Sequence, residues 1–229
     1  MNGVGRGPIV TLDGPAGAGK TSTAKEVARR LRLRHLDSGA LYRALTVALL
    51  EAGISQDRWP ELTSDELRAL GVTLVGVEGG FEVRIGGRPL GDELRTREVT
   101  GRVALLARLP AVRACLLELQ QAAGEHGGLV ADGRDMGTVV FPGAEVKVFL
   151  VADLHERARR RLLQGGTDLG NPEMLAAEAE AIAHRDDQDS GRDLSPLRRP
   201  EGAAEIDTTG LSFDEQVEAI VSLVCRLTL

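Results

Sequence analysis

The stretch GPAGAGKT at residues 14–21 constrains the fold of this chain more than any other feature. It matches the pattern G-x-x-x-x-G-K-[ST] at every fixed position. Residues 9–12 (IVTL), directly before it, form a short apolar run typical of a buried parallel strand. Residues 20–33, directly after it, repeat small and apolar side chains at helical spacing. A strand, a glycine-rich loop and a helix in this order predict a phosphate-binding loop in an α/β protein.

The chemistry of this loop predicts a nucleoside triphosphate as ligand. Glycines allow backbone N–H groups to turn toward a polyphosphate, and the helix N-terminus adds partial positive charge. Lys20 is expected to reach the β- and γ-phosphates, and the Thr21 hydroxyl to ligate the Mg²⁺ that accompanies ATP. The alternative, a glycine-rich connection with a chance lysine, does not explain the flanking strand and helix. The expected ATP-binding residues are Gly14, Pro15, Ala16, Gly17, Ala18, Gly19, Lys20, Thr21 and Ser22.

Further strands and helices alternate along the rest of the chain. A helix is expected from the cap pair Asp37–Ser38 to Gly53, and a hairpin over residues 72–85 around a Glu-Gly-Gly turn. The other predicted elements are helices at 94–108 and 111–123, strands at 129–131 and 146–151, helices at 155–164 and 172–186, a polar loop at 188–203, a short strand at Ile206 and a helix at 213–227. This order predicts a parallel sheet with helices on both faces, plus a small antiparallel β insertion, in a single domain over residues 1–229.

Composition narrows the class of partner. The chain has 34 acidic and 28 basic residues, a net charge of −6 and only 3% aromatic residues. This balance disfavours a nucleic-acid-binding surface. No apolar run approaches the roughly 20 residues needed to cross a bilayer, and residues 1–8 lack the apolar core of a signal peptide. We expect a cytoplasmic monomer without membrane or nucleic-acid partners, in which Cys115 and Cys225 are unpaired apolar side chains.

The segment after the strand at 129–131 limits the class of reaction that the chain could catalyse. A GTPase would carry [NT]-K-x-D, but none of the lysines (Lys20, Lys25, Lys147) is followed by Asp two residues later. A motor-type ATPase would end a hydrophobic strand in Asp-Glu, whereas this strand runs into Asp132-Gly133-Arg134-Asp135. An arginine at that edge of the sheet predicts a second anionic substrate. Phosphoryl transfer to a small molecule is therefore favoured.

Four sequence blocks resemble the bacterial cytidylate kinases. They are LDGPAGAGKTS at 12–22, LDSGALYR at 36–43, ADGRDMGTVVFP at 131–142 and RDDQDSGR at 185–192, followed by Ser195-Pro196-Leu197. The resemblance runs from about Pro8 to the C-terminus, and the last two blocks are its specific parts. The β insertion at 72–92 is similar to the enlarged monophosphate-binding region of these enzymes. The resemblance implies a P-loop kinase that transfers the γ-phosphoryl group of ATP to CMP or dCMP.

The resemblance also implies a CMP site assembled from distant parts of the chain. Its residues are Ser38, Arg43, Asp132, Arg134 and Arg185 around the phosphate, Tyr42 in the pocket wall, Arg113 and Asp135 at the cytosine edge, and Asp189 and Arg192 at the sugar. Ala104 is a departure, because some members of the family have Ser there, near the base. Thr21 is another variable position, where some relatives have Gly.

The expected mechanism is in-line transfer with charge stabilisation, with a monophosphate-binding region at about 39–110 and a lid at about 157–170 closing over the substrates. The residues expected to neutralise the transferring group are Lys20, Arg134, Arg185, Arg157 and Arg161. The dense arginines of the helix at 155–164 have a plainer alternative as a solvated helix face. Two alternatives for the whole chain are a related kinase for UMP, dTMP or shikimate, and a nucleotide-binding switch without an acceptor.

Overall fold

The computed structural model describes residues 7–166 and 171–228. Within these ranges one sheet has the strands β1 (Ile9–Asp13), β2 (Arg34–Asp37), β3 (Val72–Val77), β4 (Gly80–Ile85), β5 (Arg88–Pro89), β6 (Leu129–Asp132), β7 (Val146–Val151) and β8 (Ala204–Asp207). The α-helices are α1 (Lys20–Leu31), α2 (Ser38–Glu51), α3 (Ser64–Ala69), α4 (Arg97–Leu106), α5 (Pro110–Gly124), α6 (Leu154–Gln164), α7 (Pro172–Ser190) and α8 (Phe213–Thr228). Two 3-10 helices, η1 (Gln56–Glu61) and η2 (Asp92–Arg95), and a π-helical turn, η3 (Met136–Val140), complete the described elements.

The core of the sheet is parallel, which confirms the predicted fold class. The strand order is β3-β4-β2-β6-β1-β7-β8, with β5 paired to β4. Strands β2, β6, β1, β7 and β8 pair in parallel, and Leu12 and Asp37 both lie beside Asp132 in the register. The carboxyl ends of β1, β2 and β6 therefore meet at one edge, where ligands bind in sheets of this kind.

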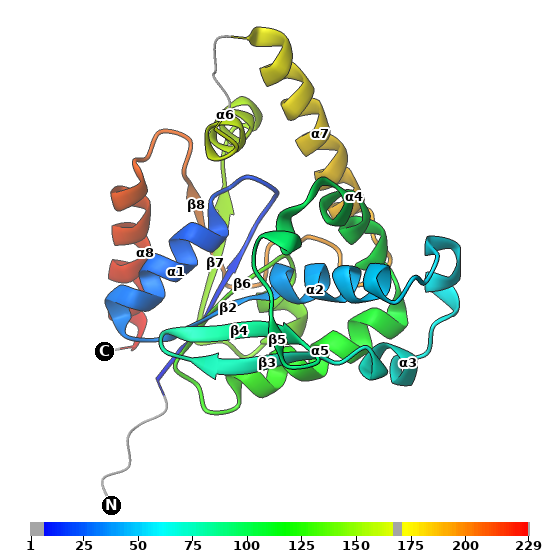
Figure 1. The fold of residues 1–229 in the computed structure, drawn as a ribbon. Coiled ribbons are helices and arrows are strands. Elements are labelled where there is room, and N and C mark those ends of the chain that lie inside the picture. Colours follow the sequence, from blue (N-terminus) through cyan, green and yellow to red (C-terminus); the bar gives the residue numbers. More distant parts are fainter. Residues whose placement is uncertain (1–6, 167–170, 229) are drawn as a thin grey trace, which may run out of the picture.

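Helices cover both faces of this sheet, as Figure 1 shows. On β6, Val130 belongs to the core shared with α1 and α8, whereas its neighbours Leu129 and Ala131 pack with Met136 and the end of α5. Consecutive strand residues point to opposite faces, so these two cores lie on opposite sides of the sheet. The near-continuous burial of β1 and β6 follows from this double coverage.

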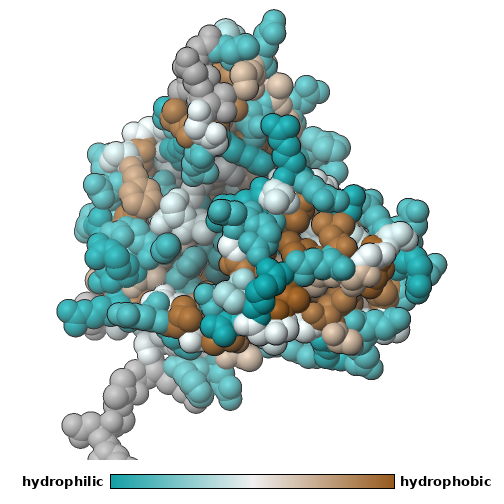
Figure 2. All heavy atoms as spheres, viewed as in Figure 1, coloured by the Kyte–Doolittle hydropathy of each residue, from teal (hydrophilic) through white to brown (hydrophobic). Residues whose placement is uncertain are grey.

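A separate core lies under helices α2 to α5. It is built around the fully buried Leu41, Leu45, Trp59 and Leu116. Hydrophobic residues reach the surface chiefly over α2 and the segments beside it, while hydrophilic residues cover most of the remaining face in Figure 2. The region predicted to bind the acceptor thus has its own packed interior.

The insertion is joined to the core sheet through backbone pairing. Strands β3 and β4 form the predicted antiparallel hairpin, and β4 continues the sheet beside β2 at the pair His35–Gly80. A Cβ on Gly80 would lie 2.5 Å from the carbonyl oxygen of His35, so only glycine fits at this junction. The hairpin is an extension of the sheet and not a separate unit.

Several predicted boundaries were wrong. Strand β2 was not predicted because its sequence, RHLD, is short and polar. The helices η1 and α3 were also missed, and the predicted helix at 94–108 is split into η2 and α4. Helix α7 continues to Ser190, where Gly191 follows it, so the start of the predicted loop at 188 is helical. Asp189 is consequently held on a helix.

Candidate active site

The phosphate loop (residues 14–22) has the conformation that its glycines permit. Gly17 and Gly19 have φ angles of 77° and 82°, in the left-handed region. A Cβ on Gly14 would lie 2.2 Å from the carbonyl oxygen of Leu150, on the neighbouring strand. Helix α1 begins at Lys20, within this segment, so the positive end of its dipole lies at the glycines.

Lys20 lies buried on the floor of the site, with 6% of its surface exposed. Its Nζ donates to the carbonyl oxygen of Pro15 at 2.6 Å. Burial lowers the pKa of Lys20 well below its ordinary value, and the neighbouring Arg134 lowers it further. A buried ammonium group in this position is ready to pair with an anion that enters from the cleft.

A cleft of about 1110 Å³ opens beside the loop, a volume at the upper end of ordinary small-molecule sites. It brings together most of the site residues predicted from sequence: Ala16, Gly17, Gly19, Lys20, Thr21, Ser22, Ser38, Tyr42, Arg43, Arg113, Asp132, Arg134, Asp135, Arg161, Arg185, Asp189 and Arg192. Gly14, Pro15, Ala18 and Arg157 are not among the residues that line it. Segments that are far apart in the chain thus supply one lining.

Asp132, the last residue of β6, connects the phosphate loop to the neighbouring strand β2. The Thr21 hydroxyl donates to Asp132 Oδ2 at 2.6 Å, and His35 Nε2 lies 2.8 Å from Oδ1. A hydroxyl and a carboxylate side by side are the hard oxygen donors that suit Mg²⁺, which takes its remaining ligands from water and from substrate phosphates. The two side chains therefore have the chemistry that a magnesium ion requires of its protein ligands.

Asp13, at the end of β1, holds the turn that follows β6. Its carboxylate accepts hydrogen bonds from the backbone N–H groups of Met136 and Gly137, each at 2.8 Å. Burial raises the pKa of Asp13 to about 6. These bonds fix the backbone that carries Arg134 and Asp135 into the cleft.

Arginines face one another across the cleft. Arg43 donates to the carbonyl oxygen of Leu94 and to the hydroxyl of Thr100. Burial lowers the pKa of Arg43, and Arg95, Arg161 and Arg134 lower it further.

Arg185 gives the strongest evidence that this group of arginines binds an anion. Burial, and then the neighbouring Arg134, lower its pKa to about 10. Within the described residues, its buried Nε has no hydrogen-bond partner. Buried polar atoms are almost always paired, so a converging group of guanidinium cations with an unpaired donor indicates a binding site for a phosphate-like anion.

The carboxylate of Asp189 binds two of the cations in the cleft, Arg134 and Arg192. Arg134 Nε donates to Asp189 Oδ2 at 2.7 Å, and Arg192 Nη2 donates to Asp189 Oδ1 at 2.6 Å. Burial by itself would raise the pKa of Asp189, but Arg134 and Arg192 outweigh it and hold the pKa below its ordinary value. Asp189 thus stays ionised and orients both arginines.

The cleft is also lined by an oppositely charged pair, Arg113 and Asp135. Arg113 and Asp135 form an ion pair through Nη2, and Arg113 Nε donates to the hydroxyl of Ser195 at 3.1 Å. The Arg113 guanidinium also lies 5.7 Å from the centre of the Tyr42 ring. A guanidinium beside a carboxylate offers both donors and acceptors, as the edge of a nucleobase requires.

The two arginines predicted on the lid have different surroundings. Arg161 lines the cleft, and its Nε lies 2.9 Å from a carboxylate oxygen of Glu178 on α7. Arg157 is buried against the outer side of the phosphate loop, where it donates to the carbonyl oxygens of Ala16 and Ala152, each at 3.0 Å. The structure therefore does not bring Arg157 to the cleft. Residues 167–170 of the predicted lid lie outside the described residues.

Sequence reasoning missed several residues near the site. Arg95 lines the cleft from η2, and Thr100 positions Arg43 from α4. His35, Asp186 and Ser195 contact Asp132, Ala16 and Arg113 respectively. Only Asp186 and Ser195 lie within a recognised block, and nothing in the sequence around Arg95 marks it as a site residue.

The described residues give three further results. No helix among them is long and apolar enough to span a membrane. They also contain no group of three or more His, Cys, Asp or Glu side chains arranged to hold a metal ion. Cys115 and Cys225 are both free; the first is buried and the second is partly exposed.

Comparison with known proteins gives the family. The sequence model of the cytidylate kinase family matches residues 10–226. A cytidylate kinase of Exiguobacterium sibiricum is 43% identical over 214 residues, which cover 93% of this chain and 95% of that protein. A bifunctional pantoate ligase/cytidylate kinase of Synechocystis is 45% identical over 94% of this chain, and the match spans 42% of its own length.

Solved structures agree with the fold. A gluconokinase from Sinorhizobium meliloti superposes with a TM-score of 0.50 at 15% identity, covering 97% of this chain and 94% of that one. The similarity at this identity concerns the α/β fold alone. The extent of the sequence match decides the family: the chain belongs to the cytidylate kinases.

Proposed function

We propose that this chain transfers the γ-phosphoryl group of ATP to CMP or dCMP, giving ADP and CDP or dCDP. Phosphoryl transfer from ATP to CMP is the activity of the cytidylate kinase family, to which the chain belongs. The observation that carries the proposal is the group of arginines opposite Lys20, in which a buried donor of Arg185 has no partner among the described residues. A site for one triphosphate needs the loop alone, so a second set of cations supports a second phosphate.

The acceptor phosphate would lie among Arg43, Arg134 and Arg185. The second pKa of a phosphate monoester is about 6, so CMP is largely dianionic at neutral pH and its oxygen is already nucleophilic. No general base is then needed, and the arginines have the task of holding the dianion in line with the γ-phosphate. Ser38 also lies on the cleft wall and would donate to the same phosphate.

The donor phosphates would lie along the phosphate loop, with Lys20 at the β- and γ-phosphates. Lys20, Arg134, Arg185 and Arg161 would share the charge that develops on the transferring group. Thr21 and Asp132 would hold Mg²⁺, which when bound supplies charge neutralisation at the β- and γ-oxygens. The hydrogen bond between Thr21 and Asp132 keeps both oxygens at that position.

The nucleoside of the acceptor would extend from the arginines toward Tyr42. Arg113 and Asp135 would offer a donor and an acceptor to the cytosine edge, with Arg113 held by its hydrogen bond to Ser195. Asp189 and Arg192 would lie against the sugar. A carboxylate and a guanidinium are hydrogen-bonding partners for sugar hydroxyls, and we propose that this subsite takes the sugar of dCMP as well as that of CMP.

The regions around the cleft would take separate tasks. Residues 39–110, with the hairpin, would hold the monophosphate, and a lid at about 157–170 would close over the phosphates to exclude water. We place the enzyme in the cytoplasm as a monomer, because ATP and CMP are cytoplasmic metabolites and one chain supplies every side chain of the proposed site.

An acceptor panel tests the proposal. The purified chain is incubated with ATP, Mg²⁺ and each of CMP, dCMP, UMP, dTMP and shikimate, and ADP is measured in a coupled assay. We expect CMP and dCMP to give the highest kcat/KM. A higher value for another acceptor would reject the assignment of the base site. If CMP fails to bind in the absence of ATP by calorimetry, a switch without an acceptor would replace the kinase.

A further inference from the structure

The outer side of the phosphate loop is held by a pair of charged residues that do not line the cleft. Asp186 Oδ1 accepts a hydrogen bond from the backbone N–H of Ala16 at 2.9 Å, and Arg157 Nη1 donates to the Ala16 carbonyl oxygen at 3.0 Å. Arg157 and Asp186 also form an ion pair with each other. Both backbone polar groups of a single loop residue are thus bound by two side chains that are themselves paired.

This contact is tightly packed. The side chains of Arg157 and Asp186 are 10% and 18% exposed. A Cβ on Gly17 would lie 3.0 Å from the Cβ of Arg157, so the loop lies directly on the helix backbone. Ala16 packs into a small apolar cluster with Ala158 of α6 and Ile182 of α7. Three elements therefore meet at Ala16 without space for independent movement.

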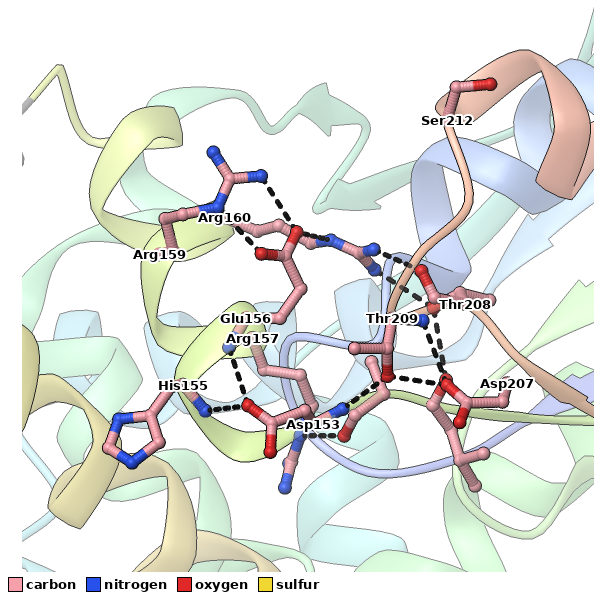
Figure 3. Close-up of polar contacts among 12 residues, drawn as sticks. Asp153, His155, Glu156, Arg157, Arg159, Arg160, Asp207, Thr208, Thr209 and Ser212 are labelled. Carbon is pink, nitrogen blue, oxygen red and sulfur yellow. Dashed lines mark hydrogen bonds and ion pairs between the residues drawn. The ribbon is translucent and has the colours of Figure 1, made fainter.

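Helix α6 is itself anchored to the loop that follows β8, as Figure 3 shows. Arg160 donates to the hydroxyl of Thr208 at 2.9 Å, and Glu156 accepts from Arg160 at 2.8 Å. The N–H of Asp153 donates to the hydroxyl of Thr209 at 2.8 Å. The side chain of Arg157 therefore extends from a helix that is itself held against the loop after β8.

Helix α7 carries this loop contact and the proposed acceptor contacts on adjacent turns. Asp186 follows Arg185 directly and precedes Asp189 by three residues, and residues three or four apart share one helix face. Asp189 is bound to Arg134 at the end of β6, and Arg185 lines the cleft. A shift of α7 relative to the phosphate loop would therefore change the distance between the two phosphate sites.

We propose that Arg157 and Asp186 form a positioning pair that fixes the phosphate loop relative to helix α7, and so sets the alignment of the donor phosphate with the acceptor phosphate. The inference rests on the proposed kinase function and reassigns Arg157, which the sequence placed among the catalytic cations. Neither residue touches substrate: both act through the backbone of Ala16. Misalignment of reacting groups by about 1 Å costs up to about 10²-fold in rate.

Asp186→Asn tests the proposal, with Asp187→Asn as the matched control. The control makes the same change of charge one residue along the same helix, at an exposed side chain. For Asp186→Asn we expect kcat with CMP to fall by about 10- to 100-fold, because the loop loses its alignment. We also expect the Kd of a non-hydrolysable ATP analogue to rise, while the Kd of CMP measured without ATP stays within about 2-fold. Asp187→Asn should stay within about 2-fold in all three measurements.

Three further variants keep the test decisive. Arg157→Lys keeps the charge but cannot contact both Ala16 and Asp186 with one planar group. If the two residues act as one unit, the double variant Arg157→Lys/Asp186→Asn should lose no more activity than the worse single variant. If Asp186→Asn does not fold, Asp186→Glu keeps the charge and shifts the carboxylate by one methylene, and kcat should still fall several-fold.

The outcomes separate this proposal from the function itself. A wild-type chain that does not phosphorylate CMP would reject the proposed function. A wild-type chain that does so, with an Asp186→Asn variant whose melting temperature falls but whose kcat and KM match those of Asp187→Asn, would show a purely structural pair and overturn the positioning role. Additive losses in the double variant would also overturn it.

Discussion

Arg134 and Asp189 are joined by a hydrogen bond of 2.7 Å that connects the end of strand β6 to helix α7. The same carboxylate accepts from Arg192 at 2.6 Å. One acidic side chain therefore fixes a cation of the proposed phosphate site and a cation of the proposed sugar site. A movement of Asp189 would therefore displace the cations of both proposed subsites together.

Arg134→Ala should cripple the acceptor reaction. The substitution removes a cation from the proposed phosphate site and leaves Asp189 with one of its two partners. We expect kcat/KM for CMP to fall by about 10²–10³-fold, with binding of an ATP analogue changed much less. Steady-state kinetics with varied CMP give the first number, and calorimetry gives the second. Unchanged kinetics would reject the pocket described above.

Lys20→Ala should remove most of the turnover while the fold survives. The ammonium group is the cation on the floor of the phosphate loop, and loss of one such charge costs about 10²–10³-fold in rate. Stability should be kept or increased, because burial already lowers the pKa of Lys20. Lys147→Ala, on β7 and outside the cleft lining, is the control. A Lys20→Ala variant with near-native rates would disprove the assignment.

Thr21→Val should lower the apparent affinity of the enzyme for Mg²⁺. Valine has nearly the same shape but lacks the hydroxyl that donates to Asp132 at 2.6 Å. We expect the Mg²⁺ concentration for half-maximal rate to rise by about 5- to 10-fold, since one oxygen ligand is lost. Titration of the rate with Mg²⁺ at saturating ATP and CMP measures this shift. A Mg²⁺ curve identical to that of the wild type would argue against Thr21 as a ligand.

Ala104→Ser should improve base recognition. Ala104 lines the cleft together with Arg113 and Asp135, and a serine hydroxyl there could bond the cytosine edge. One added hydrogen bond is worth about 0.5–1.5 kcal/mol, so KM for CMP should fall by about 2- to 10-fold. Comparison with UMP shows whether the gain is specific. An equal change for both bases would mean that the hydroxyl does not contact the base.

Asp37→Asn should change how stability depends on pH. Burial, and then the neighbouring Asp132, raise the pKa of Asp37 from 3.8 to about 6. The folded chain then binds the proton more tightly than the unfolded chain. The stabilising contribution of Asp37 is full below pH about 4 and is lost as pH rises through about 6.

Asparagine caps helix α2 as well as aspartate does and carries no charge to bury. We expect the variant to be more stable than the wild type at pH 8, by about 1–2 kcal/mol after allowance for water in the cleft, and less so at pH 5. Thermal unfolding at the two pH values tests this. An advantage of equal size at both would contradict the predicted linkage.

The sequence predicted those parts of the site whose spacing is imposed by the ligand. The phosphate loop has a fixed pattern because its backbone must wrap a phosphate, and the block at 131–142 follows a strand that is apolar enough to identify. The alternation of strands and helices was sufficient for the sheet. Arg95 could not be found in this way, because one arginine in a short 3-10 helix follows no period.

Arg157 shows a different limit. Residues 157 and 161 share a helix face, so sequence spacing places both arginines together. The structure separates them, because the phosphate loop lies over the first turns of α6 and covers Arg157, while Arg161 extends past the edge of the loop. Tertiary contact, not periodicity, decides which arginine reaches the cleft.

Strand β2 lies inside the sheet although its sequence is that of an edge. Three of its residues, Arg34, His35 and Asp37, are polar or charged, a composition that protects exposed edges against unwanted pairing. Because β4 pairs with β2 at His35 and Gly80, these polar side chains do not guard a free edge: the outermost strand on that side of the sheet is β3.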